Sequence, residues 1–260
     1  MAASPQRRGT ARGNDPKNFF LTSGEGWKQL EIDIVINAAD AEADAPKLKF
    51  YGQFDPPVDK FLYDRYFSGR ELSGVVLECG AFDGITESSC RFFEESLGWQ
   101  AINIEASPSI YAKLVQQRPQ SRNLNVALSN QQGQAEFVDV TYPGYELCTN
   151  GSLSHLQAHR EWLDNANCTY TKTVVPTCTF KDLVRDLALE RLDLMVLDIE
   201  GHELQALQGF AGAHILPDVL CVEHGHLGVN ALREVIQPLG YCFDTTSHVN
   251  SFYVLQGNCR

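Results

Sequence analysis

Short apolar runs alternate along this chain with segments in which apolar residues recur at helical spacing. A short apolar run bounded by turn residues predicts a buried strand, and recurrence every three or four residues predicts an amphipathic helix. Strands are expected at 75–78, 101–105, 123–128, 134–140, 192–198 and 219–223. Helices are expected at 58–67, 86–98, 108–118, 180–187, 202–208 and 232–239.

This alternation predicts an α/β fold with a doubly wound, Rossmann-like sheet that is mostly parallel and has helices on both faces. Two further strands, at 240–244 and 251–255, flank a short loop and predict an antiparallel closing hairpin. One domain is expected at 50–260, with an insertion at about 141–171. Residues 1–49 are expected to form a disordered or loosely ordered N-terminal extension, because residues 1–18 are rich in Arg, Gly, Pro and Ser.

Composition limits the partners. The 260 residues are 43% hydrophobic, enough for one sizeable core, and the formal net charge is −12. An acidic body repels phosphates, so neither nucleic acid nor an anionic membrane is expected as a partner. No apolar run approaches the roughly 20 residues that span a bilayer, and residues 1–18 lack the apolar centre of a secretory signal. A cytoplasmic location is therefore expected; the oligomeric state is not predicted.

The eight cysteines lack the paired C-x-x-C spacing of a zinc site. Cys79, Cys90, Cys221 and Cys242 fall in predicted core elements and are expected to be free thiols. Two glycosylation sequons, starting at Asn150 and Asn167, lie in the cysteine-flanked insertion. Because glycosylation occurs in the secretory pathway, its lumen is the alternative location.

The loop after the first predicted strand has the composition of a small-molecule site. Glu78 ends the apolar run, and Gly80 and Gly84 permit positive φ and a close backbone approach. The spacing differs from the G-x-G-x-x-G of dinucleotide-binding loops, and Asp83 would repel a pyrophosphate. A ligand with a cationic centre fits better, and S-adenosylmethionine carries a sulfonium and an ammonium. A structural turn would explain this loop equally well if it stood alone.

The second strand supplies independent support, because it ends in Glu105, where an acid can bind ribose hydroxyls. Agreement between the loop and this acid favours S-adenosylmethionine as the cofactor. The residues predicted to bind it are Glu78, Gly80, Ala81, Asp83, Gly84, Glu105 and Asp198.

Several segments together resemble the FkbM family of methyltransferases. They are the loop 78–84, residues 97–99 and 104–106, the segment 197–204 with 207–209, and residues 222–224. The resemblance runs from about residue 51 to 255, and Asp198-Ile199-Glu200-Gly201-His202-Glu203-Leu204 is its most specific part. Phe82 departs from the pattern, since many members have Asn there. The resemblance implies methyl transfer from S-adenosylmethionine to oxygen, often a hydroxyl of a sugar, glycan or glycosylated small molecule.

Candidate catalytic residues follow two neighbouring strands. Asp198 and Glu200 end the strand at 192–198, and His224 follows the strand at 219–223. A histidine titrates near neutrality, so His224 is the predicted general base, ahead of His226 and His202.

Other chemistry near these strands stays open. Glu203 is expected only to complement a helix N-terminus. Asp198, Glu200, Glu223 and His224 could bind Mg²⁺ or Mn²⁺, but no ligand spacing singles out an ion and no metal is predicted. The insertion aromatics Tyr142, Tyr145 and Trp162 could stack on a sugar or pack the insertion down. Two other functions remain: a catalytically silent cofactor-binding module and, less favoured, a dinucleotide-dependent oxidoreductase.

Overall fold

A computed structural model describes residues 48–69, 73–145, 148–225 and 227–257 of the chain. The predicted extension lies outside the described residues, except for Leu48 and Lys49. Core packing begins at Phe50, whose ring centroid lies 4.4 Å from that of Phe92.

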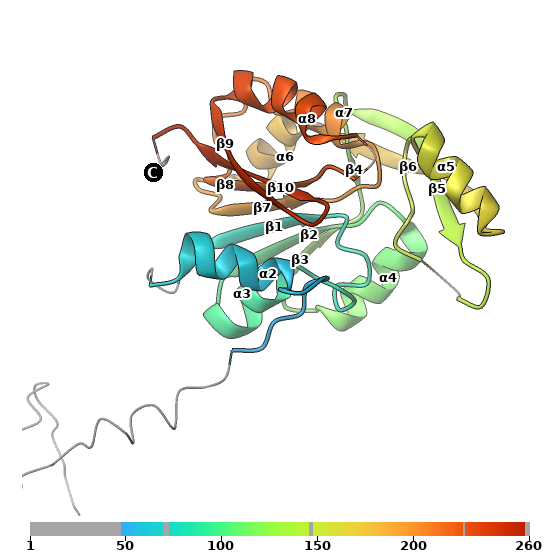
Figure 1. The fold of residues 1–260 in the computed structure, drawn as a ribbon, viewed down its shortest axis with the longest axis horizontal. Helices are drawn as coiled ribbons and strands as arrows, with labels where there is room; N and C mark the ends of the chain where they lie inside the picture. Colours follow the sequence, from blue (N-terminus) through green and yellow to red (C-terminus); the bar gives the residue numbers. More distant parts are fainter. Residues whose placement is uncertain (1–47, 70–72, 146–147, 226, 258–260) are drawn as a thin grey trace, which may run out of the picture. The chain divides into compact units, whose positions relative to one another are not determined.

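A seven-stranded sheet forms the centre of the fold, with strand order β3-β2-β1-β7-β8-β10-β9 (Figure 1). The strands from β3 to β8 are parallel, and β10 is antiparallel to both β8 and β9. Their bounds are β1 Val75–Cys79, β2 Gln100–Ile104, β3 Arg122–Leu124, β7 Leu194–Leu197, β8 Val219–Glu223, β9 Tyr241–Ser247 and β10 Asn250–Leu255. The predicted doubly wound, mostly parallel sheet with a closing hairpin is confirmed.

Helices cover both faces of this sheet because its strands are apolar on both sides. Val76 and Val196 belong to the core cluster under α2 and α3, whereas Leu77 and Leu197 belong to the cluster under α6, α7 and α8 (Figure 1). The helices are α2 Val58–Leu62, α3 Arg91–Leu97, α4 Pro108–Gln117, α6 Phe180–Asp186, α7 Glu203–Gln208 and α8 Val229–Ile236. A π-helical turn, η1 Tyr63–Phe67, follows α2, and a 3-10 turn, η2 Gln237–Leu239, follows α8.

A second, three-stranded sheet corrects the strand predicted at 123–128. That segment divides into β3, in the main sheet, and β4 Ala127–Leu128, which pairs in parallel with β6 Thr169–Cys178. β6 is also antiparallel to β5 Gly133–Thr141, and helix α5 Gln157–Asn165 lies between them in the chain. We call residues 127–178 the cap; Figure 1 shows its β5, α5 and β6 gathered beyond one end of the main sheet.

The helix predicted at 86–98 begins only at Arg91, so Thr86 is not its N-cap. Asp83 holds the preceding backbone in a turn instead. Asp83 Oδ1 accepts hydrogen bonds from the backbone N–H groups of Ile85 (2.9 Å) and Thr86 (2.7 Å). Such local bonds compete with the first helical turn. The helix ends at Gly98 as predicted, with a left-handed φ of 68°.

Candidate functional site

A cavity of about 390 Å³ opens at the carboxyl ends of β1, β2, β7 and β8, where ligands bind in open α/β sheets. The cap supplies a further wall, and Gln53, Phe54 and Val58 before β1 also line the cavity. Lining residues from the main sheet and its loops include Glu78, Gly80, Ala81, Phe82, Glu105, Asp198, Glu200, His202 and Glu223, and those from the cap include Asn150, Leu153, His159 and Trp162.

Glu105 holds the loop after β1 and still faces the cavity. Its Oε2 accepts a hydrogen bond from the Phe82 N–H (2.9 Å), and its Oε1 accepts one from the Ser107 N–H (2.8 Å). Only 6% of the residue is exposed, and this burial raises the pKa of the carboxyl to about 7. Each carboxylate oxygen has a second lone pair, so Glu105 can also accept a ligand hydroxyl.

The backbone conformation at Phe82 shows why Asn suits this position and why Phe can still replace it. Its φ is 49°, in the left-handed region that Asn tolerates better than Phe. The interaction made at this position is the backbone hydrogen bond to Glu105, which any side chain permits.

Glu78, Gly80 and Ala81 also line the cavity, as predicted for cofactor-binding residues. Glu78 accepts hydrogen bonds from Ser88 Oγ (2.6 Å) and the Ser89 N–H (2.7 Å), and its burial raises its pKa to about 7. Gly80 has a φ of 87°, and a Cβ there would lie 1.7 Å from the carbonyl oxygen of Asp198. The glycine is therefore needed where the loop crosses the end of β7.

Asp83 and Gly84 do not lie among the residues lining the cavity. Asp83 uses both oxygens within its own turn, since Oδ2 accepts from Thr86 Oγ1 (2.9 Å) and Oδ1 accepts the two backbone bonds already described. A Cβ on Gly84 would meet Leu114 Cδ1 at 2.5 Å and Arg118 Cγ at 2.7 Å, so this glycine permits packing against α4. Asp83 and Gly84 therefore stabilise the conformation of the loop without facing the cavity.

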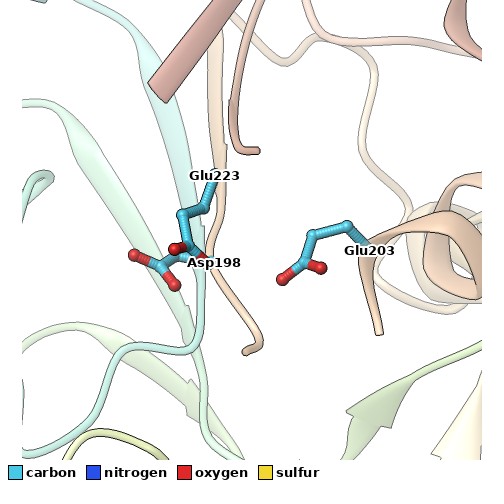
Figure 2. Close-up of side chains that lie close together, drawn as sticks. All are labelled: Asp198, Glu203 and Glu223. Atoms are coloured by element: carbon cyan, nitrogen blue, oxygen red, sulfur yellow. The ribbon is translucent and has the colours of Figure 1, made fainter. Parts of the chain in front are cut away.

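Three carboxylates meet where β7, β8 and α7 converge. Figure 2 shows Asp198 and Glu223 side by side, with Glu203 turned toward them. One carboxylate oxygen from each lies within 4.8 Å of the others. Glu203 accepts hydrogen bonds from the backbone N–H groups of Ile199 (2.9 Å) and Gly201 (3.0 Å), a structural role as predicted. We assign no ion to the cluster.

Asp198 and Glu223 share a hydrogen bond that lowers the pKa of Asp198 and raises the pKa of Glu223. Desolvation by the surrounding cavity walls raises the pKa of Asp198 to about 6, although the residue is exposed to the open space of the cavity. Burial, followed by repulsion from Asp198 and Glu200, raises the pKa of Glu223 to about 10. At neutral pH the pair therefore holds one proton, with Glu223 donating to an ionised Asp198.

Glu200 connects the main sheet to the cap. Its Oε1 accepts a hydrogen bond from Asn150 Nδ2 (3.1 Å), and its Oε2 lies 3.7 Å from Nδ1 of His159 on α5. Burial, and then repulsion from Asp198, raises its pKa. Its φ of 58° is left-handed, which costs a non-glycine residue roughly 1–2 kcal/mol. Such strain clusters at functional sites.

The sequence did not single out Asn150 or His159 as site residues. The one available signal was the spacing of His155, His159 and Trp162, which places them on one face of a helix. His159 is 2% exposed, and Trp162 is 51% exposed while still lining the cavity.

His224 does not line the cavity, so the structure does not bring the predicted general base to the site. Adjacent residues of a strand point to opposite faces, and Glu223 faces the cavity. The His224 N–H donates to the Val249 carbonyl (2.7 Å), and the His224 carbonyl accepts from the N–H of Leu227 (2.9 Å). We therefore reassign the base in the proposal below; His226 lies outside the described residues.

His202 lines the cavity, and its uncharged imidazole forms hydrogen bonds with the cap. Its Nε2 lies 3.0 Å from Ser129 Oγ, and its Nδ1 lies 2.7 Å from Ser154 Oγ. Burial lowers its pKa to about 4, so it carries no charge at neutral pH. The other insertion aromatics, Tyr142 and Tyr145, contact each other at 6.0 Å between ring centroids and do not line the cavity.

The sheet order, the closing hairpin and the acid-lined cavity at the strand ends define a methyltransferase of the Rossmann-like class. A model of the "Methyltransferase FkbM domain" matches residues 78–242, more than half of the chain. The chain belongs to the FkbM methyltransferase family, and its cofactor is S-adenosylmethionine. The donor set fits that molecule, because Glu105 lines the cavity at the end of β2 and can accept ribose hydroxyls.

Solved structures of similar fold include an FkbM methyltransferase from Methylobacillus flagellatus, with 14% identity, a TM-score of 0.49, and coverage of 76% of this chain and 48% of that chain. This chain thus spans about half of that protein's length. Fibrillarin from Aeropyrum pernix with bound S-adenosyl-L-methionine has 10% identity, a TM-score of 0.43, and coverage of 77% and 74% of the two chains. No curated protein matches the chain.

Three observations bear on the compartment. Within the described residues, no helix is long and apolar enough to cross a bilayer. Cys242 is disulfide-bonded, so it is not among the free thiols expected for most of the cysteines. Of the two sequon residues, Asn150 is used inside the cavity by Glu200, whereas Asn167 is exposed.

Proposed function

We propose that this chain is an S-adenosylmethionine-dependent O-methyltransferase acting on a hydroxyl of a sugar, a glycan or a glycosylated small molecule. The observation that carries the proposal is Asp198, a carboxylate with a pKa of about 6 that lies between the Gly80 loop and the cap. An ionised carboxylate at this place can accept a hydroxyl proton at neutral pH.

The two parts of the cavity suit the two substrates. At the β1 and β2 end, Glu105 would accept the ribose hydroxyls, and the backbone from Gly80 to Phe82 would line the rest of the cofactor. At the β7 and β8 end, Asp198, Glu200 and Glu223 face the cap. An acceptor placed between these carboxylates and α5 would therefore meet the cofactor next to Asp198.

Catalysis in this arrangement consists mainly of positioning. When bound, S-adenosylmethionine supplies a methyl carbon made electrophilic by its sulfonium. Asp198 orients the acceptor hydroxyl and takes its proton as the oxygen–carbon bond forms and the carbon–sulfur bond breaks, with that electron pair passing to sulfur. Glu223 donates a hydrogen bond to Asp198 and so fixes the basic oxygen. The cap excludes water from the reacting atoms.

Transfer of a ¹³C-labelled methyl group tests this proposal directly. The chain is incubated with S-adenosylmethionine labelled at the methyl carbon and with a panel of hydroxylated glycans, and the products are followed by NMR. We expect the labelled signal to move to the position of an O-methyl carbon, because the base aligned with the cofactor is a carboxylate suited to a hydroxyl.

The alternatives give different results in the same experiment. A silent binding module would bind the cofactor and leave the label on sulfur across the whole panel. A dinucleotide-dependent enzyme would bind NAD in preference to S-adenosylmethionine. A labelled N-methyl or C-methyl product would contradict the proposed acceptor atom while leaving the methyltransferase assignment intact.

A further inference from the structure

The β7 and β8 end of the cavity is rich in carboxylates, and no Lys or Arg lies among the described residues that line it. Six carboxylates line the cavity, and none of its described lining residues is Lys or Arg. The six are Glu78, Glu87, Glu105, Asp198, Glu200 and Glu223. The Arg118 guanidinium, near the loop, contacts the Glu94 carboxylate (2.6 Å) and the Gly84 carbonyl instead of a cavity acid.

The cavity acids differ in the number of hydrogen bonds that they accept from the protein. Glu78 and Glu105 each accept two hydrogen bonds from the β1 and β2 loops. Glu200 accepts one hydrogen bond, from the Asn150 amide, and repels both Asp198 and Glu223. Like charges in an enclosed site of low dielectric cost free energy, which a ligand cation would recover.

The opposite wall fits a ring with hydroxyl groups. Trp162 on α5 lines the cavity with half of its surface exposed, and the amide of Asn150 and the imidazole of His159 lie beside Glu200. An indole face stacks on the C–H face of a sugar and also attracts a nearby ammonium. The indole and the amide carry no charge and offer no counter-charge to a phosphate, a sulfate or a carboxylate.

We propose that the hydroxyl acceptor carries a protonated amine, as an amino sugar does, and that this ammonium pairs with Glu200, beside the Asp198–Glu223 pair, while the ring lies against Trp162. The proposal rests on the proposed function, since it names the acceptor class of the same site. Acceptors bearing phosphate, sulfate or carboxylate are disfavoured by the same charges.

Three chitosan-type oligosaccharides of equal length test the proposal: one with free amines, one N-acetylated and one N-sulfated. Binding to the chain loaded with S-adenosylhomocysteine is measured by calorimetry, and kcat/KM is measured for methyl transfer. We expect the free amine to bind about tenfold or more tightly than the N-acetylated form, because a charge-assisted hydrogen bond is lost on acetylation. The N-sulfated form should not bind measurably.

Glu200→Gln should reduce the preference for the free amine by about tenfold and change N-acetylated binding little. Glu161→Gln, on the exposed side of α5 and outside the cavity lining, should leave the preference unchanged and is the matched control. Equal binding of the amine and its N-acetylated form, tighter binding of the sulfated form, or an unchanged preference in Glu200→Gln would overturn the proposal. Absence of methyl transfer to every oligosaccharide would refute the proposed function, and the binding preference would still decide this inference.

Discussion

Replacing Asp198 with Asn should lower kcat for methyl transfer by about 10²–10⁴-fold, the usual contribution of a positioned base. The amide keeps the shape of the side chain and can still accept the hydrogen bond from Glu223, but it cannot take a proton. Stability should change little, because the substitution also removes the repulsion between Asp198 and Glu200. Initial rates at saturating cofactor, together with thermal melting, provide the measurement.

The pH profile separates Asp198 from other bases. With a pKa of about 6, Asp198 is protonated and inactive below that pH and ionised above it, so the wild-type rate should rise through pH of about 6 and then level. Asp198→Asn should abolish this rise, whereas Asp186→Asn, on the exposed end of α6, should preserve it. A profile that persists in Asp198→Asn and is lost in His224→Ala would restore His224 as the base.

Gly80→Ala should destabilise the fold by several kcal/mol. A left-handed φ costs a non-glycine residue roughly 1–2 kcal/mol. The overlap between the new Cβ and the Asp198 carbonyl oxygen, only 1.7 Å apart, adds typically 1–3 kcal/mol as loop and strand shift. This is a large part of the 5–15 kcal/mol that stabilises a typical domain. Urea unfolding followed by circular dichroism measures the loss.

Gly98→Ala is the matched control, because Gly98 also has a positive φ, 68°, but no atom lies within 4 Å of its added Cβ. It should incur the conformational cost alone, about 1 kcal/mol. Equal destabilisation by the two variants would show that the Gly80 loop does not lie against β7. The sequence-based interpretation, in which Gly80 makes room for the cofactor, would then regain support.

The main sheet was predictable because its parallel strands are buried on both faces. All five residues of β1 are buried, and such strands appear in a sequence as continuous apolar runs. The acids that end these runs were predictable as site residues for a related reason. The carboxyl ends of parallel strands meet at one edge of a sheet, so Glu105 after β2 and Asp198 after β7 lie at the same edge, on either side of β1.

The cap was not predictable in the same way. β6 alternates between buried residues such as Val175 and exposed ones such as Val174, which is 65% exposed, and its polar positions resemble a loop. The contacts of Glu200 with Asn150 and His159 join residues about 40 to 50 positions apart, and no local spacing encodes them. His224 was predicted as the base because it directly follows β8, but its neighbour Glu223 lines the cavity instead, since adjacent positions along an extended chain point in opposite directions.

Calorimetric titration of S-adenosylmethionine into the wild-type chain and Glu105→Gln tests most directly whether this cavity holds the cofactor. We predict that one molecule binds per wild-type chain and that Glu105→Gln weakens binding by about tenfold or more, because an amide replaces a charged acceptor of ribose hydroxyls. Glu136→Gln, at an exposed position of β5, should bind as the wild type does, and thermal melting should show all three proteins folded. Equal affinity in a folded Glu105→Gln variant would contradict the assignment of the cavity as the S-adenosylmethionine site.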